Sequence, residues 1–209
     1  WTLRSVLTLA TFEDVVFSHR SRKAASIHPF LTDHLTALGR GHPVIRAYHE
    51  ALVCCFERGL APTHWRRILA VLIPKTYGDA LSPKDLRDIW LLAHGQKLAN
   101  KFLLTSVFTS ISDRYQACAA GFGKGRCIAE LTMASHGSIS LANKQRRNLY
   151  VLYVDLSKCF MSFSRVVALQ VMKIHGLPPE AATAWWGMYG GGIEGVFETA
   201  YGSSGWFKI

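Results

Sequence analysis

The sequence lacks the residue patterns that identify several common classes of protein. Its five cysteines are an odd number and include no CxxC pair, so neither a disulfide framework nor a zinc knuckle is predicted, and we expect a reducing compartment. The nine histidines form no HExxH or HxxxH pair, which argues against a histidine metal site. No internal repeat or low-complexity tract is visible in the 209 residues.

Long apolar runs and a leader pattern are missing as well. The longest aliphatic run is ILAVLI, residues 68–73, which is far too short to cross a bilayer. The first residues do not show the successive regions of a signal peptide. We therefore expect a protein without a membrane partner that is intracellular, in the nucleus or the cytoplasm, and not secreted. Because the chain begins at Trp1 rather than at methionine, we also expect it to be a segment of something longer.

What the sequence has in quantity is apolar and positively charged side chains. Hydrophobic residues make up 49% and charged residues 18%, which is enough to bury a core in one large domain or two small ones. The formal net charge is +10, and residues 61–150 hold most of it, with thirteen Lys and Arg against five acids. A local basic excess suits a polyanion such as nucleic acid, and it equally suits a surface that only keeps the protein soluble.

Hydrophobic periodicity predicts helices interleaved with strands. The helical segments are expected at residues 42–59, 96–115, 128–147, 164–176 and 177–190. Strands are expected at residues 67–73, ended by Pro74, and at residues 148–155, with a hairpin in residues 195–209. This order predicts a two-layer α+β fold.

The strongest predicted strand, residues 148–155, ends on a single carboxylate. Its sequence NLYVLYVD is apolar at both odd and even positions, as in a strand covered on both faces. The carboxylate of Asp155, together with the carbonyl of Leu156, would offer Mg²⁺ the hard oxygen ligands it prefers. Two-ion chemistry needs two or three carboxylates to hold ions about 3.5–4 Å apart, so Asp155 alone could also simply cap the turn after the strand.

Five segments in order along residues 62–209 give this acid a context. They are THWRRILAVLIPK, LRDIWLLAHGQKLANKFL, GFGKGRC, VDLSKCF and ETAYGSSGWFKI. Together they resemble the fingers and palm of a reverse transcriptase, an RNA-directed DNA polymerase of the kind found in non-LTR retrotransposons and group II introns. A single segment such as DLxxxF is common by chance, and the order of the five is what carries the resemblance.

The resemblance implies a right-hand polymerase fold. Residues 1–148 would form the fingers region, with a basic strand–turn–strand and a glycine loop. Residues 149–209 would form the first part of the palm, an antiparallel sheet with packed helices. The expected reaction of the intact protein is template-directed nucleotidyl transfer with two Mg²⁺ ions, on an RNA template and a DNA primer with dNTP as substrate.

The resemblance also implies roles for particular side chains. Asp155 would be the catalytic acid and, with Leu156, a ligand of Mg²⁺. Lys75 and Arg87 would clamp the triphosphate of the dNTP, where positive charge helps most. Phe160 would pack under the sugar and exclude a 2′-hydroxyl. The plain alternatives are two surface cations and a core aromatic.

Two cations of the glycine loop, Lys124 and Arg126, would contact the template backbone, with an ordinary solvated loop as the alternative. The loop is not a P-loop, because Cys118 and Gly125 stand where GxxxxGK[ST] needs glycine and Ser or Thr.

The sequence departs from the family pattern in several places. The usual RPI reads RDI, with Asp88 in place of proline, and Ala119 and Met161 replace the usual Gln and Asp. The stretch RKAASIHPFL has none of the glycines of the family's GPDG element. The YxDD carboxylates, the GxxQG loop and the thumb do not occur in these residues, so we expect no polymerisation without downstream palm and thumb segments of the same polypeptide. The alternatives are a non-catalytic nucleic-acid-binding remnant of the same fold and a protein-interaction domain with an incidental basic face.

Overall fold

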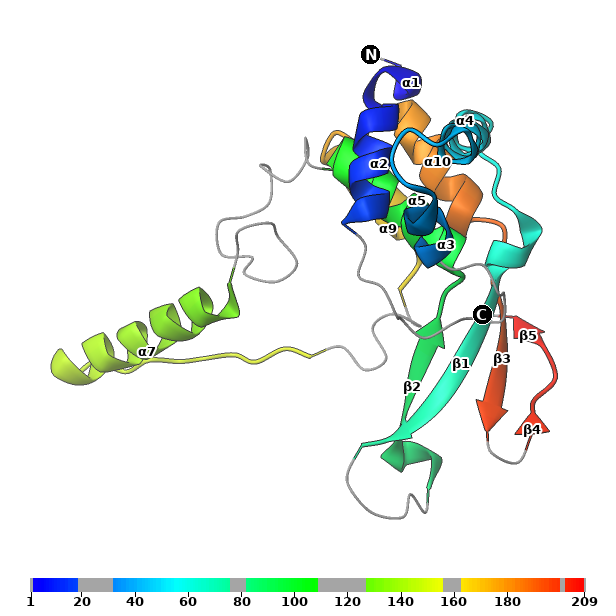
Figure 1. Ribbon diagram of the computed structural model, residues 1–209. Coiled ribbons are helices and arrows are strands. Elements are labelled where there is room, and N and C mark those ends of the chain that lie inside the picture. The colour runs from blue at the N-terminus through cyan, green and yellow to red at the C-terminus, as the bar shows by residue number, and fades with distance from the viewer. Residues whose placement is uncertain are drawn as a thin grey trace. The chain divides into compact units, whose positions relative to one another are not determined.

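A computed structural model of the chain describes residues 2–18, 32–75, 82–108, 127–155, 163–199 and 202–208. The chain divides into two compact units, one made of residues 1–108 and 164–209 and the other of residues 109–163. In the first unit, the helices gather at one end of a small twisted sheet (Figure 1). None of the helices in the described ranges combines the length and the hydropathy that a membrane span requires.

The first unit begins with three short helices that the sequence patterns do not predict. They are α1 (Leu3–Val6), α2 (Leu9–Phe17) and α3 (Thr32–Leu38). Thr2 and Thr8 cap the first two, because each side-chain oxygen accepts a hydrogen bond from the backbone N–H three residues later. These caps satisfy donors that a helix start otherwise leaves without partners.

Helix α4 (Pro43–Glu57) and helix α5 (His94–Leu103) build the core of this unit with α2. Proline at the first helical position and Gly59 at a φ of 61° just beyond the end fit the predicted helix, which is confirmed. Phe12 of α2 meets Phe102 of α5 edge to face, with ring centroids 5.1 Å apart. Both rings are fully buried, so this contact lies at the centre of the helical layer.

An exposed ion-pair group ties α1 to α4. The guanidinium of Arg4 contacts the carboxylates of Glu50 at 2.8 Å and Glu57 at 3.0 Å. The hydrogen bonds from Arg4 hold the pKa of Glu57 below its ordinary value. Because the three side chains are well exposed, water and salt screen the attraction and the contribution to stability is small.

The remaining helices agree with the predicted segments. They are α7 (Ile128–Lys144) in the second unit and α9 (Arg165–Ile174) and α10 (Pro179–Tyr189) in the first, while α5 continues as a π-helical turn, η3 (Leu104–Phe108). Ser164 caps α9 by accepting from the N–H of Val167 at 3.4 Å. The predicted helix over residues 96–115 is therefore confirmed through residue 108, and the rest of it lies outside the described residues.

The sheet of the first unit is mixed. Its strands are β1 (Arg67–Pro74), β2 (Leu86–Leu91), β3 (Glu194–Thr199), β4 (Gly202–Ser203) and β5 (Phe207–Lys208), with 3-10 turns η1 (Thr63–Arg66) and η2 (Pro83–Asp85) before β1 and β2. Strand β1 pairs antiparallel with β2 and parallel with β3, and both β4 and β5 pair antiparallel with β3. The α+β class and the hairpin after residue 194 are confirmed. The sheet is not purely antiparallel, because β1 and β3 run in the same direction.

The predicted strand at residues 148–155 is wrong. Residues 147–155 form no strand, and the side chains of Tyr150, Leu152 and Tyr153 are between 86% and 89% exposed. A strand needs a neighbour to receive its backbone hydrogen bonds, and no strand of the described ranges pairs with this segment. The apolar composition therefore predicted a buried strand, but the described part of the chain provides no neighbouring strand to pair with it.

Helix α10 crosses the end of α4 with backbone against backbone, and this contact depends on a glycine. A Cβ atom on Gly187 would lie 2.3 Å from the carbonyl carbon and oxygen of Gly59. We expect Gly187→Ala to lower the free energy of unfolding by about 2 kcal/mol, because backbone atoms cannot move aside as a side chain can. The steric cost therefore exceeds the gain of about 1 kcal/mol that alanine normally brings inside a helix.

The matched control is Gly137→Ala in α7. Nothing lies within 4 Å of a Cβ at Gly137, so alanine should add helical stability of up to about 1 kcal/mol there. Urea denaturation and far-UV circular dichroism of the two variants measure the difference. Similar behaviour of both variants would show that the close contact between α10 and α4 is not formed.

Candidate functional site

The tip of the β1–β2 hairpin carries two of the predicted site residues. The ladder runs from Leu69 opposite Leu91 to Pro74 opposite Leu86. One residue further, the backbone N–H of Lys75 donates to the carbonyl of Asp85 at 2.8 Å, which continues the pairing into the turn. Lys75 thus lies at the strand tip, where the sequence predicts it.

Lys75 and Arg87 lie on the same face of this hairpin. Arg87 is directly opposite Ile73, and directly opposite residues of an antiparallel pair project to the same side. Lys75 follows Ile73 by two residues, one residue beyond the end of β1, and continuing the alternation of the strand puts it on that side. Both side chains are exposed, and within the described residues neither forms an ion pair with an acid.

Within the described part of the chain, the ammonium of Lys75 donates a hydrogen bond to the backbone carbonyl of Lys84 in the turn. A carbonyl is a neutral acceptor, so this bond does not neutralise the positive charge of Lys75. An anionic oxygen in its place would keep a hydrogen bond to the ammonium and add the attraction between opposite charges. The hairpin tip is therefore able to receive an anion at small cost.

Asp88, the acid in place of the family's proline, projects away from this face. Successive residues of a strand alternate sides, so Asp88 lies on the face opposite Arg87. There the indole Nε1–H of Trp90 donates to the carboxylate of Asp88 at 2.6 Å. The negative charge that the sequence places beside the predicted phosphate site is thus held on the other side of the sheet.

Asp155 lies at the end of the exposed segment in the second unit, whereas Lys75 and Arg87 belong to the first. No group of three or more His, Cys, Asp or Glu that could hold a metal occurs among the described residues. One carboxylate is too few for a two-ion site, so these residues do not make a Mg²⁺ site by themselves. The predicted site residues Leu156, Phe160, Lys124 and Arg126 lie outside the described part of the chain.

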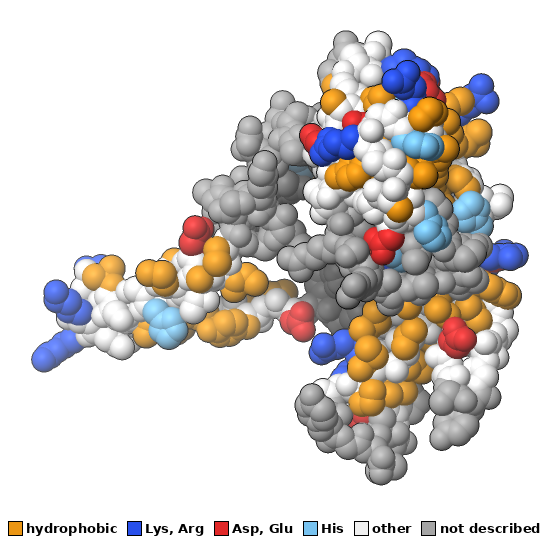
Figure 2. All heavy atoms as spheres, viewed as in Figure 1, with side chains coloured by type: hydrophobic (Ala, Val, Ile, Leu, Met, Phe, Trp, Pro, Cys, Tyr) orange, Lys and Arg blue, Asp and Glu red, His pale blue; other side chains and the backbone are white. Residues whose placement is uncertain are grey.

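The second unit shows where another part of the basic excess lies. Helix α7 has no buried residue, and hydrophobic side chains are exposed over much of it (Figure 2). Three cations, Lys144, Arg146 and Arg147, follow one another at its carboxyl end. Cations at this end of a helix are favoured by the partial negative charge of its last carbonyls, which is sufficient reason for their position.

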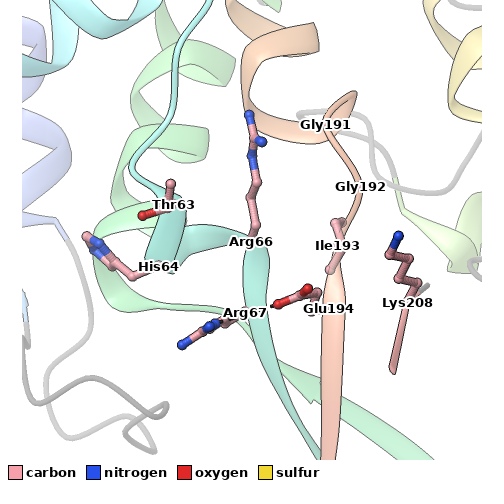
Figure 3. Close-up of a pocket in the computed structure, with 9 residues that line it drawn as sticks. All are labelled: Thr63, His64, Arg66, Arg67, Gly191, Gly192, Ile193, Glu194 and Lys208. Atoms are coloured by element: carbon pink, nitrogen blue, oxygen red, sulfur yellow. Dashed lines mark ion pairs between the residues drawn. The ribbon is translucent and has the colours of Figure 1, made fainter. Parts of the chain in front are cut away.

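The sequence patterns missed a second group of cations, at the start of β1. Arg66, Arg67 and Lys208 line a cavity of about 460 Å³ with the glycine turn that leads into β3 (Figure 3). The Arg-Arg pair directly before a predicted strand was a usable signal. Lys208 offered none, because it is brought there by the pairing of β5 with β3.

Comparison with known proteins adds no relative. No protein-family model matches the sequence, and no curated protein matches it significantly.

Proposed function

We propose that the chain is the fingers and first part of the palm of an RNA-directed DNA polymerase of a retroelement, with the β1–β2 hairpin tip as the site for the triphosphate of a dNTP. The observation that supports this most is the common exposed face of Lys75 and Arg87 on a strand–turn–strand. The resemblance to reverse transcriptases assigns triphosphate binding to the same two residues. RNA template and DNA primer are the macromolecular partners in this proposal.

The physical basis is the charge of the ligand. A dNTP brings about four negative charges on its phosphates, and cations that reach the transferring group contribute mainly by stabilising that charge. Lys75 offers a point charge and Arg87 a planar fork of donors. Exchange of the Lys84 carbonyl for a phosphate oxygen would add the attraction between opposite charges to the hydrogen bond that Lys75 makes.

The proposed reaction also needs acids that hold Mg²⁺, and Asp155 is our candidate for the first of them. Bound Mg²⁺ supplies charge neutralisation for nucleotidyl transfer. Since one carboxylate is too few, the other ligands would come from downstream segments of the same polypeptide, and these 209 residues alone should not extend a primer. A non-catalytic nucleic-acid-binding remnant is the second candidate, favoured by the basic groups at the start of β1 and at the end of α7.

Binding measurements on the 209-residue chain separate these candidates. We expect Lys75→Ala and Arg87→Ala each to weaken dNTP binding about tenfold, since hydrogen bonds to charged groups contribute about 1.5–3 kcal/mol. Binding of single-stranded RNA should change little in either variant. The control is Arg46→Ala, which removes an exposed cation of α4 and should change the affinity for neither ligand. Calorimetry with dATP and fluorescence anisotropy with labelled RNA give the two affinities.

The outcomes differ between the candidates. Equal losses of RNA affinity and dNTP affinity in the Lys75→Ala and Arg87→Ala variants would favour the non-catalytic nucleic-acid-binding remnant. RNA binding through phosphates should fall with salt at a log–log slope of about −0.7 for each contacted phosphate. Absence of salt-dependent RNA binding would count against both and favour the protein-interaction domain.

A further inference from the structure

The cavity at the start of β1 is the strongest unexplained feature of the first unit. It lies between η1 and the first residues of β1 on one side and the turn from α10 into β3 on the other (Figure 3). Strand β5 borders it with Lys208. Lys75 and Arg87 are at the opposite end of β1, so this cavity is separate from the hairpin tip.

The side chain of Arg66 packs against the glycine turn with a buried nitrogen atom that lacks a hydrogen-bond partner within the described part of the chain. Its guanidinium lies against Gly191, where an added Cβ would be 2.5 Å from Cζ. The Nε atom is buried and has no hydrogen-bond partner among the described residues. Leaving a buried donor unpaired costs about 1–3 kcal/mol, so such a donor indicates a place where an acceptor belongs.

The other charges around the cavity leave a positive excess. Arg67 and Lys208 are both opposite Glu194 in the sheet, on either side of β3. Glu194 is paired with Arg67, Nε to Oε2 at 3.6 Å. Within the described part of the chain Lys208 has no ion pair, so Arg66 and Lys208 are two cations without an acid.

Two glycines of the turn, Gly191 and Gly192, line the cavity with backbone alone. Gly192 has a φ of 80°, a conformation that other residues adopt only with strain, and both Gly191 and Gly192 are exposed. Figure 3 shows Arg66 extending toward Gly191, with Lys208 on the neighbouring strand directed to the same turn. Backbone and two cations thus converge on a space that Gly191 and Gly192 border without side chains.

We propose that this cavity binds a phosphate group, with Arg66 and Lys208 as the side chains that hold it. A guanidinium presents a fork that matches phosphate oxygens, and a lysine adds a mobile point charge. Glu194 keeps Arg67 engaged, so two positive charges face the ligand. The phosphate can belong to the backbone of a nucleic-acid strand or to a free anion. This inference stands independently of the polymerase proposal, because none of its residues is part of the hairpin tip.

The test compares two ligands on the same variants of the 209-residue chain. Inorganic phosphate is titrated by calorimetry, and a labelled single-stranded RNA is titrated by anisotropy at several salt concentrations. We expect Arg66→Gln and Lys208→Gln each to lower the affinity for the ligand that the cavity binds about tenfold. If that ligand is the RNA, the magnitude of the salt slope should fall by about 0.7 in each variant. Arg46→Gln on α4 is the matched control.

A third variant, Gly191→Ala, keeps every charge and displaces the guanidinium of Arg66. This variant should weaken binding of the same ligand. A diffuse attraction to the net charge of the protein would predict no change, because the charge is the same. An effect on RNA alone identifies a strand backbone, and saturable phosphate binding lost in the variants identifies a free anion. If both titrations are unchanged in Lys208→Gln, an exposed position that leaves the core intact, the proposal is wrong. Circular dichroism verifies that Arg66→Gln and Gly191→Ala are folded.

Discussion

Leu103→Ala is expected to lower the free energy of unfolding by about 3 kcal/mol, whereas Leu104→Ala next to it should cost less than about 1 kcal/mol. Leu103 closes α5 with 1% of its surface exposed, and Leu104 begins the π-helical turn with 57% exposed. The two substitutions remove the same atoms from the same helical segment. Helix propensity changes little from leucine to alanine, so burial is the property that differs.

The reason for the large effect is the cavity that remains. Phe102, Leu98 and Val107 around this segment are all buried, and a close-packed core relaxes only partly when a side chain is shortened. Urea denaturation followed by tryptophan fluorescence gives both free energies, with equal slopes required for the comparison. Similar losses for Leu103→Ala and Leu104→Ala would mean that α5 does not pack into the core as described.

On the proposed polymerase function, we expect Asp155→Asn to reduce primer extension at least about 10³-fold in a polypeptide that also carries the proposed downstream palm. Replacing an anionic ligand by a neutral amide removes several kcal/mol of metal binding and charge stabilisation, and each 1.36 kcal/mol corresponds to a factor of ten in rate. RNA affinity should stay nearly unchanged, because an acid does not attract phosphates. Radiolabelled primer extension and RNA anisotropy give the two quantities.

The control for this variant is Glu130→Gln, which neutralises an exposed acid of α7 in the same unit. It should leave primer extension as it is. Loss of RNA binding together with extension in Asp155→Asn would indicate an acid that supports the fold. Unchanged extension in Asp155→Asn would exclude a catalytic role for this residue.

The elements that the sequence predicts correctly are those with local signals. Gly59 follows the end of α4, Ser164 begins α9, and Pro74 ends β1. Each of these residues acts on its own backbone or that of the next turn, so a few neighbouring residues contain the information. Helices α1 to α3 escaped prediction because they are short and depend on packing more than on their own periodicity.

The predictions that failed or were missed concern partners distant in the sequence. Residues 148–155 have the composition of a buried strand, but composition does not supply the second strand that would pair with them. The parallel pairing of β1 with β3 and the position of Lys208 beside Arg66 join segments more than a hundred residues apart. Lys75 and Arg87, in contrast, belong to two strands that follow one another in the sequence, so their positions at the tip and after the turn could be anticipated.

The length of strand β1 sets the distance between the two proposed binding sites. At about 3.3 Å per residue, the backbone from Arg67 to Lys75 covers about 26 Å. A single nucleotide can therefore occupy one end of the strand and never both. The two proposed sites act separately, so occupation of the hairpin tip by a dNTP should leave the affinity of the cavity for RNA unchanged.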